Sequence, residues 1–339
     1  MWGKRVMSGT EPLSFEQLNA VLRGAAEPTR LRILGLLAEM DLTVSDLTEI
    51  LRQSQPRISR HLKLLAEAGL VERSREGSWA FFRLPQENGS ADLTRQLIAQ
   101  LDPNDTVSLR DRERLAAVRS ARAAAAQAYF RTHANEWDRI RNLHIAEEAV
   151  ESAVVEALGD RPFRSLLDLG TGTGRMLELF GPQIERGLGV DLSLAMLSAA
   201  RARLDRAQLR HCAVRQGDIY DLAIPKDSFD IVLINQVLHY LDDGAGAIRE
   251  AARVLRPGGR LLVVDFAPHD LEFLRDEHAH RRLGFAPETV EQWMTAAGLD
   301  VVGQSNLPPE SGSNGKIAVS LWLARDPRLS IAGATREVA

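Results

Sequence analysis

The feature that most constrains the fold of this chain is an apolar stretch that runs directly into alternating glycines, Leu166–Gly174. Its leucines are typical of a buried strand, and Gly170, Gly172 and Gly174 follow at every second position. Glycine accepts positive φ values and has no Cβ, so the backbone can approach a ligand closely. The helix expected after the turn offers N–H groups without partners inside the helix. The stretch therefore predicts a strand–turn–helix ligand site.

From about Arg164 onward, short apolar segments alternate with amphipathic ones, which is typical of a parallel α/β sheet. We expect strands at Ser165–Leu169, Gly187–Asp191, His211–Gln216, Ile231–Asn235, Arg260–Asp265, Asp300–Gln304 and Ile317–Ala324. Open α/β sheets bind ligands at the carboxyl ends of their strands. The pattern predicts a Rossmann-like seven-stranded sheet in the C-terminal half, with its site at that edge.

A dinucleotide site is one alternative for the glycine turn, and its fingerprint is G-x-G-x-x-G. Counting from Gly170 places Arg175 at the third glycine position, and counting from Gly172 places Leu177 there. The fingerprint fails in both registers. The glycine turn therefore does not predict a nicotinamide cofactor.

The stretch instead resembles the first motif of class I S-adenosylmethionine (SAM)-dependent methyltransferases, in which an acidic residue, here Asp168, stands two positions before the first glycine. Later segments match the rest of that family's pattern in order. Gly189–Asp191 ends the second strand, Gln216–Ile219 follows the third, and Asn235–Tyr240 follows the fourth. Arg256–Gly259 precedes the fifth strand. The resemblance implies a methyltransferase domain that binds SAM.

The resemblance also implies individual roles. Asp191 would bind both ribose hydroxyls, Asp218 would accept from the adenine amino group, and Asn235 would line the methionine end. For Met196, an ordinary core position is nearly as compatible as contact with adenine. The SAM-binding residues expected from the family are Asp168, Gly170, Thr171, Gly172, Gly174, Asp191, Leu192, Met196, Asp218, Ile219, Asn235 and Gln236.

Methyl transfer from a sulfonium requires mainly alignment and sometimes a base, and a small-molecule acceptor is expected. His239 and Asp265 are the catalytic candidates. His269, His278 and His280 are further candidates, and Arg281 and Arg282 could hold an anionic acceptor. Solvated positions on the segment Glu272–Arg282 are an equally good explanation for any one of these later residues.

The first 84 residues have a different pattern, of short helices followed by a hairpin. Phe15, Leu18, Val21 and Leu22 share one face of a first helix, and Pro28 opens a second. Further helices are expected at Val44–Leu51, with Thr43 as N-cap, and at Pro56–Ala68, ended by Gly69; strands are expected at Leu70–Arg73 and Trp79–Leu84, around a turn at Glu76–Ser78. This order predicts a winged helix-turn-helix, mostly α with a β wing.

The segment Ser54–Leu65 resembles the recognition helix of the ArsR family of bacterial repressors, and Glu27–Leu34 resembles that family's second helix. On a helix, Ile58, Leu62 and Leu65 form an inward stripe, which leaves polar residues outward for a major groove. The residues expected to contact a double-stranded DNA operator are Ser54, Gln55, Arg57, Ser59, Arg60, His61, Lys63, Arg73 and Arg75. Between residues 52 and 83, seven Lys/Arg stand against three Glu, although the whole chain has a net charge of −4.

The chain departs from the metal-sensing members of that family. Many of them carry a Cys-x-Cys pair, and the matching positions here are Thr43 and Ser45. Cys212 is the only cysteine, which excludes an internal disulfide and any site of several thiolates, including one for arsenite methylation. We expect no metal site.

Between the two patterns, from Ala91 to about Gly159, the sequence is helical, with a break at Pro103. We expect these helices to connect the domains and to support a homodimer, because winged-helix repressors bind paired half-sites. The expected domains are 10–90, 91–160 and 161–326. No apolar run reaches the roughly 18 residues of a membrane span, and the N-terminus has no apolar signal segment, so a cytoplasmic protein with no membrane contact is expected.

Three functions are compatible with these motifs. In the first, a transcriptional regulator carries a working methyltransferase for a small molecule. In the second, the methyltransferase fold only senses SAM or S-adenosylhomocysteine (SAH). In the third, the enzyme is primary and the winged helix is an interaction module, which the outward Arg57, Arg60 and Lys63 argue against. DNA base methylation is not supported, because Asn235–Leu238 stands where an Asn/Asp-Pro-Pro-aromatic motif would lie.

Overall fold

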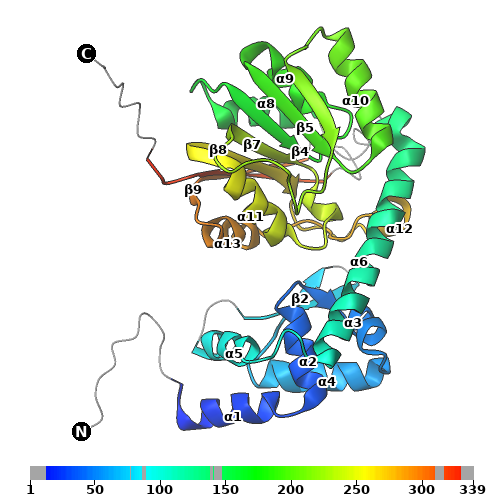
Figure 1. Cartoon of the computed structure of the whole chain (residues 1–339), viewed down its shortest axis with the longest axis vertical. Helices are drawn as coiled ribbons and strands as arrows, with labels where there is room; N and C mark the ends of the chain where they lie inside the picture. The colour runs from blue at the N-terminus through cyan, green and yellow to red at the C-terminus, as the bar shows by residue number, and fades with distance from the viewer. Residues whose placement is uncertain are drawn as a thin grey trace. The chain divides into compact units, whose positions relative to one another are not determined.

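The computed structural model describes residues 13–76, 78–85, 89–137, 140, 147–309 and 317–329. Contacts between residues divide the chain into two compact units, Met1–Ala123 and Ala124–Ala339 (Figure 1). The predicted division into 10–90, 91–160 and 161–326 remains a prediction, because the helices of the expected connector are shared between the two units.

The first unit consists of short helices and a three-stranded sheet. Its helices are α1 (Phe15–Ala25), α2 (Pro28–Leu37), α3 (Val44–Leu51), α4 (Gln55–Glu67), α5 (Gly89–Ala99) and the first part of α6 (Thr106–His133). The strands β1 (Leu42–Thr43), β2 (Glu72–Glu76) and β3 (Trp79–Arg83) lie in the order β1-β3-β2 and pair antiparallel. The predicted winged helix-turn-helix is confirmed. Gly77, in the predicted turn, lies outside the described residues.

The helix ends of this unit follow from local hydrogen bonding. The hydroxyl groups of Ser14 and Thr43 accept from the backbone N–H groups of Gln17 and Asp46, and the side chains of those two residues accept from the N–H of the cap. Each such cap contributes about 1 kcal/mol. After α4, Gly69 has φ +69°, which suits the end of a helix. Thr43 and Gly69 therefore have the roles predicted for them.

The apolar face predicted for α1 is only partly covered by the described residues. Val21 is buried, whereas Phe15 is 88% exposed, Leu22 47% and Leu18 38%. An apolar stripe on a helix is normally buried against another element. This stripe therefore remains accessible to a partner.

Ion pairs attach the first part of α6 to the helices before it. Arg32 of α2 donates twice to Asp111, at 2.7 Å in each case, and Arg122 pairs with Asp46 of α3. Asp46 and Asp111 are buried, so removal of either arginine would leave a buried carboxylate without its charged partner, which is costly. Pro103 lies between α5 and α6, which confirms the predicted break.

The second unit is built on a seven-stranded sheet with the strand order β6-β5-β4-β7-β8-β10-β9. The strands are β4 (Ser165–Leu169), β5 (Arg186–Asp191), β6 (Cys212–Gln216), β7 (Phe229–Asn235), β8 (Leu255–Phe266), β9 (Asp300–Leu307) and β10 (Val319–Arg325). The strands from β4 to β8 pair in parallel, and β10 runs antiparallel to both β8 and β9. All seven predicted strands are present, which confirms the α/β fold class.

Helices cover both faces of this sheet (Figure 1). They are α8 (Glu147–Leu158), α9 (Arg175–Phe180), α10 (Leu194–Arg206), α11 (Gly244–Val254), α12 (Phe273–His278) and α13 (Pro287–Ala296). Among the helices that the structure describes, none is both long enough and apolar enough to cross a membrane.

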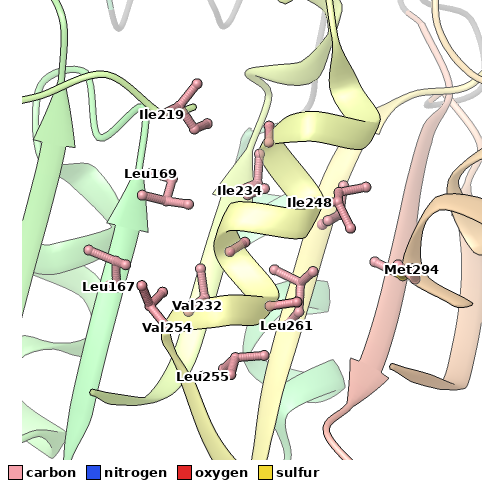
Figure 2. Close-up of a cluster of buried hydrophobic side chains, with 14 of the residues drawn as sticks. Leu167, Leu169, Ile219, Val232, Ile234, Ile248, Val254, Leu255, Leu261 and Met294 are labelled. Carbon is pink, nitrogen blue, oxygen red and sulfur yellow. The ribbon is translucent and has the colours of Figure 1, made fainter. Parts of the chain in front are cut away.

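The core follows the alternation of side chains along the strands. Leu166 joins the cluster that contains α8 and α9, whereas Leu167 joins the cluster under α11 and α13. Figure 2 shows part of the second cluster, which joins Ile248 of α11 and Met294 of α13 to strand residues such as Val232. Full burial of each such side chain contributes about 1.5–3 kcal/mol. This core fixes the strand ends that carry the site.

The largest departure from the predicted strand bounds is at the start of β8. β8 begins at Leu255 rather than at Arg260, because pairing with β7 occurs on both sides of an irregular segment. Leu255 faces Phe229 and Arg260 faces Ile231, so the residues between Leu255 and Arg260 bulge out of the ladder, with Gly258 at φ +72°. Proline cannot donate to the ladder and glycine accommodates the bend, so Arg-Pro-Gly-Gly forms a bulge within β8.

Replacement of Asp111 by alanine tests the attachment of α6. The guanidinium of Arg32, whose side chain is only 24% exposed, would lose both of its charged hydrogen bonds. We expect the free energy of unfolding of the full chain in urea to fall by about 2–3 kcal/mol. Glu113→Ala, at an exposed position of the same helix, is the matched control and should change it by less than about 0.5 kcal/mol. Equal losses in the two variants would contradict the role given to the ion pair.

Candidate functional site

The glycine turn after β4 is fixed by close contacts. A Cβ on Gly170, which has φ +70°, would lie 2.4 Å from Cγ2 of Val237. Gly174 has φ +79° and precedes α9, and a Cβ there would lie 3.0 Å from Cβ of Ala200. The N–H of Gly170 donates to the carbonyl of Val190 in β5, at 2.8 Å. Only glycine fits at these two positions, so the bare backbone of the turn lies at the carboxyl edge of the sheet.

Asp168 supports the turn from inside. Its carboxylate is buried, and Oδ2 accepts a hydrogen bond from Oγ1 of Thr171 at 2.5 Å. Thr171 is also buried. The acidic residue before the glycines therefore shapes the turn through Thr171.

Asp191, at the end of β5, joins two turns. Its Oδ2 accepts from the N–H of Gly172 at 2.9 Å, and its Oδ1 accepts from the N–H of Ser193 at 2.8 Å. Burial raises the pKa of the Asp191 carboxyl, and the backbone donors partly oppose that shift. Further donors from a ligand, such as a pair of hydroxyl groups, would favour the ionised form. The carboxylate is well placed for a ligand rich in hydroxyl groups.

The end of β6 lies next to that of β5. The N–H of Gly217 donates to the carbonyl of Asp191 at 3.1 Å. Asp218 is exposed, and one of its oxygens accepts from the N–H of Tyr220 at 2.9 Å. Of the other expected adenine contacts, Leu192 is partly exposed, whereas Met196 and Ile219 are buried. The burial of Met196 is compatible with both of its predicted explanations.

The end of β7 carries an unusual backbone and an unsatisfied acceptor. Gln236 has φ +56° although it is not a glycine, and its N–H donates to the carbonyl of Val264 at 2.7 Å. Such a conformation costs about 1 kcal/mol and is frequent at functional sites. The side-chain oxygen of Asn235 is buried without a hydrogen-bond partner among the described residues. A buried polar atom of this kind favours a ligand or water as its partner.

The two residues predicted as catalytic lie in contact. Nδ1 of His239 is 2.7 Å from Oδ1 of Asp265, and both side chains are almost completely buried. Asp265 also accepts from the N–H groups of Phe266, at 2.8 Å, and of His239, at 3.3 Å. The structure thus joins a histidine at the end of β7 to an aspartate near the end of β8.

A pocket lies beside this pair. Its walls include three aromatic side chains, Trp137, Tyr240 and Phe266, and three imidazoles, His239, His278 and His280, and aliphatic side chains and Gln236 complete it. The pocket adjoins the glycine turn, because a Cβ on Gly172 would lie 3.6 Å from Nε1 of Trp137. It therefore combines aromatic ring surface with imidazole and amide groups.

The structure places the later candidate residues differently from one another. His278 and His280 line the pocket, whereas His269 does not. Burial lowers the pKa of His269 to about 4, so this imidazole is neutral near neutral pH. Nε of Arg281 donates to Asp242 at 3.0 Å.

The prediction that Arg281 and Arg282 hold an anionic acceptor is not supported. Neither of them lines the pocket, and both side chains are buried. Their backbone N–H groups donate to the carbonyl of His239 at 2.8 and 2.9 Å. The pair of arginines therefore supports the position of His239.

The residues at this edge fit SAM as a cofactor. The glycine turn leaves open backbone, Asp191 offers acceptors for ribose hydroxyls, and Asn235 presents an unsatisfied oxygen. The described residues contain no group of three or more His, Cys, Asp or Glu side chains that could hold a metal ion.

The candidate DNA-contacting surface lies on α4 and β2. Ile58, Leu62 and Leu65 are buried beneath α4, as predicted. The exposed residues of the predicted set are Ser54, Gln55, Arg57, Ser59, Arg60 and Lys63 on or beside α4, and Arg73 and Arg75 on β2. We call these eight residues the basic face. The members on α4 face outward because the apolar stripe on the opposite side of the helix is buried.

His61 lies apart from the basic face. Its side chain is only 12% exposed, and Nδ1 lies 3.6 Å from a carboxylate oxygen of Glu27. Burial lowers the pKa of His61, although the carboxylate of Glu27 acts in the opposite direction. The expected contact of His61 with DNA is therefore replaced by a contact inside the unit, because the helical turn directs this side chain toward α2.

Trp137 is one of the pocket residues that the sequence motifs missed. It lies far in the chain from the strand ends. The ring centroid of Phe130 is 5.3 Å from that of Trp137 and 4.9 Å from that of Tyr240. In a chain with only 5% aromatic residues, the close spacing of Tyr129, Phe130 and Trp137 was the available signal.

Comparisons with known proteins agree with both halves of the chain. Residues 27–73 match the family described as bacterial regulatory protein, arsR family, and residues 167–263 match the methyltransferase domain family. The first match covers α2 to the start of β2, and the second covers the glycine turn and the ends of β5, β6 and β7 but stops before Asp265.

Individual relatives resemble the second half. The uncharacterized methyltransferase YcgJ of Bacillus subtilis is 36% identical over 106 residues, which are 31% of this chain and 42% of YcgJ. The ubiquinone/menaquinone biosynthesis C-methyltransferase UbiE of Vibrio parahaemolyticus is 35% identical over 122 residues, 35% of this chain and 47% of UbiE. The chain thus spans less than half the length of these two relatives.

Among solved structures, a chain from the complex between the Haloferax volcanii Trm112 methyltransferase activator and a methyltransferase aligns with a TM-score of 0.50 and 22% identity, over 59% of this chain and 98% of that chain. At that identity the likeness concerns the fold. The chain therefore joins a helix-turn-helix domain of the bacterial arsR family to a methyltransferase domain.

Proposed function

We propose that this protein is a DNA-binding transcriptional regulator whose methyltransferase domain binds SAM and transfers its methyl group to a small molecule. The observation that carries the enzymatic part is the arrangement at one sheet edge. There, the glycine turn and Asp191 lie beside an aromatic pocket that contains His239. A cofactor site and an acceptor site next to each other are what a group transfer requires.

Each part of the edge has a role in this proposal. Asp191 binds the ribose hydroxyls, Asp218 accepts from the adenine amino group, and Asn235 with Gln236 contacts the methionine end. Gly170, Thr171, Gly172 and Gly174 bring bare backbone to the cofactor, Asp168 shapes that turn, and Leu192, Met196 and Ile219 line the adenine. The acceptor occupies the pocket. A relative named as a ubiquinone/menaquinone biosynthesis C-methyltransferase is consistent with an organic acceptor of small size.

Titration calorimetry with SAH tests the cofactor site. We expect wild-type protein to bind SAH and Asp191→Asn to weaken binding by about 10- to 100-fold, because hydrogen bonds to a charged group contribute about 1.5–3 kcal/mol. Asp205→Asn, at an exposed position of α10, is the matched control and should bind as wild type does. Circular dichroism establishes that each variant is folded. Folded wild-type protein that does not bind SAH would refute the cofactor site.

The basic face supports the DNA-binding part. Arg57 and Arg60 of α4 are exposed and have no hydrogen-bond or ion-pair partner among the described residues. Arg73 and Arg75 are exposed on β2, where a wing can lie along the phosphate backbone. Such residues can exchange bound counterions for phosphates. The proposed operator is double-stranded DNA, and the role places the protein in the cytoplasm.

Fluorescence anisotropy with a short mixed-sequence DNA duplex tests the basic face. We expect Arg57→Ala and Arg60→Ala each to weaken binding by about 10-fold or more, and to reduce the slope of log K against log salt by about 1. Arg110→Ala, an exposed arginine of α6, is the matched control. Equal binding by all three variants would exclude α4 from the interface.

We also propose that the protein is a homodimer, with the exposed apolar stripe of α1 in the interface. Phe15, Leu18 and Leu22 would otherwise leave apolar surface in water. Light scattering should give a dimer for the wild type and a monomer for the variant Phe15→Ser, Leu22→Ser. Wild-type protein that stays monomeric at micromolar concentration would contradict the dimer.

A second candidate function is a SAM or SAH sensor without turnover. It is favoured by the continuity of α6, whose first part carries Asp111 and Arg122 in one unit and whose last part carries Tyr129 and Phe130 in the other. A ligand can regulate DNA binding only if the two DNA-binding states differ in their affinity for it. The DNA titration repeated with saturating SAH measures that difference, and an unchanged affinity excludes the sensor.

A further inference from the structure

Of the two ring nitrogens of His239, one has a hydrogen-bond partner among the described residues and the other has none. Nδ1 lies 2.7 Å from Oδ1 of Asp265, whereas Nε2 is buried with no hydrogen-bond partner among the described residues. The carboxylate of Asp265 also accepts from backbone N–H groups, so it acts as the acceptor of the Nδ1–H as well. The lone pair of the imidazole is therefore on Nε2.

The position of Nε2 points to a ligand that donates a hydrogen bond. An unsatisfied buried polar atom costs about 1–3 kcal/mol. His239 lines the pocket and its side chain is only 2% exposed, so bulk water does not satisfy this nitrogen. A hydroxyl group inside the pocket would.

The walls of the pocket favour a flat, apolar ligand. The rings of Phe266 and His280 are stacked, with centroids 5.5 Å apart and an interplanar angle of 15°. Tyr240 and Trp137 present further ring surface. Aromatic side chains hold a planar ring through stacked or edge-to-face contacts, each contributing about 0.5–1.5 kcal/mol beyond burial.

The described lining residues favour a ligand without a permanent charge. Among the described lining residues there is no Lys, Arg, Asp or Glu. The nearby guanidinium of Arg281 is committed to Asp242 at 3.0 Å. A carboxylate or phosphate on the acceptor would be desolvated here without a partner, which is costly.

We infer that the pocket takes a neutral planar aromatic hydroxyl compound, of the phenol class, and that His239 is the base that removes its proton. This inference rests on the proposed methyltransferase function. SAM, when bound, supplies a methyl group whose bond to sulfur breaks as a bond to the phenol oxygen forms, which leaves the neutral thioether SAH. The phenol proton passes to Nε2 of His239, and Asp265 offsets the positive charge of the imidazolium until that proton leaves to solvent. Asp265 is a positioning residue, since it acts through His239.

The place of Trp137 agrees with this assignment. Its Nε1 lies 3.6 Å from the position that a Cβ on Gly172 would occupy, so one wall of the pocket contacts the glycine turn. Gln236, which also lines the pocket, follows the β7 end that is expected to contact the methionine part of the cofactor. The pocket therefore borders the part of the sheet edge where the cofactor is expected.

The test uses 4-nitrophenol as the probe, because its phenolate absorbs at longer wavelength than the neutral phenol. The full chain is saturated with SAH and mixed with 4-nitrophenol at a pH where the free probe is protonated. We expect the bound probe to show the phenolate band with wild-type protein. We expect His239→Asn, which can still donate to Asp265, to lose that band. His211→Asn, at a position just before β6 and remote from the carboxyl edge, is the matched control and should behave as wild type does.

Two analogues of 4-nitrophenol distinguish the effect of ring shape on binding from the effect of proton transfer to His239. 4-Nitroanisole lacks the hydroxyl proton, so it should bind wild-type protein more weakly than 4-nitrophenol does. It should bind wild type and His239→Asn with the same affinity. 4-Nitrobenzoate carries a full negative charge and should not compete with 4-nitrophenol. Competition by 4-nitrobenzoate would overturn the assignment of a neutral ligand.

Methyl transfer to 4-nitrophenol gives a second readout. Loss of a general base lowers the rate by about 10²- to 10⁴-fold, so His239→Asn should reduce kcat within that range while SAH binding is unchanged. Asp265→Asn should reduce kcat less and alter its pH dependence. Protein that binds SAH but neither binds nor methylates 4-nitrophenol would overturn this inference alone, whereas loss of SAH binding would overturn the proposed function with it.

Discussion

The contact on which the rest of the site depends is the close approach of Gly170 to Val237. The parallel pairing of β4 with β7 places their carboxyl ends side by side, and the absence of a Cβ on Gly170 allows the two following segments to touch. The same approach holds Gln236 in its positive-φ conformation, with its N–H on Val264 of β8. Three adjacent strand ends thereby bring the glycine turn and His239 to one edge, and any side chain at Gly170 would force them apart.

Much of this fold follows from local patterns in the sequence. The strands of the sheet, the caps at Thr43 and Gly69 and the inward stripe of α4 come from periodicity and capping chemistry, which act over a few residues. The bulge in β8 was harder to predict from the sequence, because a Pro-Gly-Gly segment also suits a turn before a strand. Only pairing with β7 on both sides of the segment distinguishes the two.

Side-chain partners were harder to predict than elements. His61 was expected on the basic face and lies against Glu27, and Arg281 was expected to face an anion and pairs with Asp242. Both outcomes depend on residues distant in the sequence or on an irregular segment, where periodicity gives no direction. The pocket shows the same limit, since Trp137 reaches it from a helical region whose sequence motifs carry no chemistry.

The arginines of the first unit include some that stabilise the fold and others that are available to bind DNA. Arg32 and Arg122 pair with buried carboxylates, and such pairs must stay intact because a buried charge without a partner is costly. Arg57 and Arg60 are exposed, and no carboxylate among the described residues neutralises them. An exposed cation loses little hydration in the free protein and keeps its full charge for a phosphate. Exposed, unpaired arginines of this kind contribute little to stability and much to binding, which explains how a chain of net charge −4 can still present a face suited to DNA.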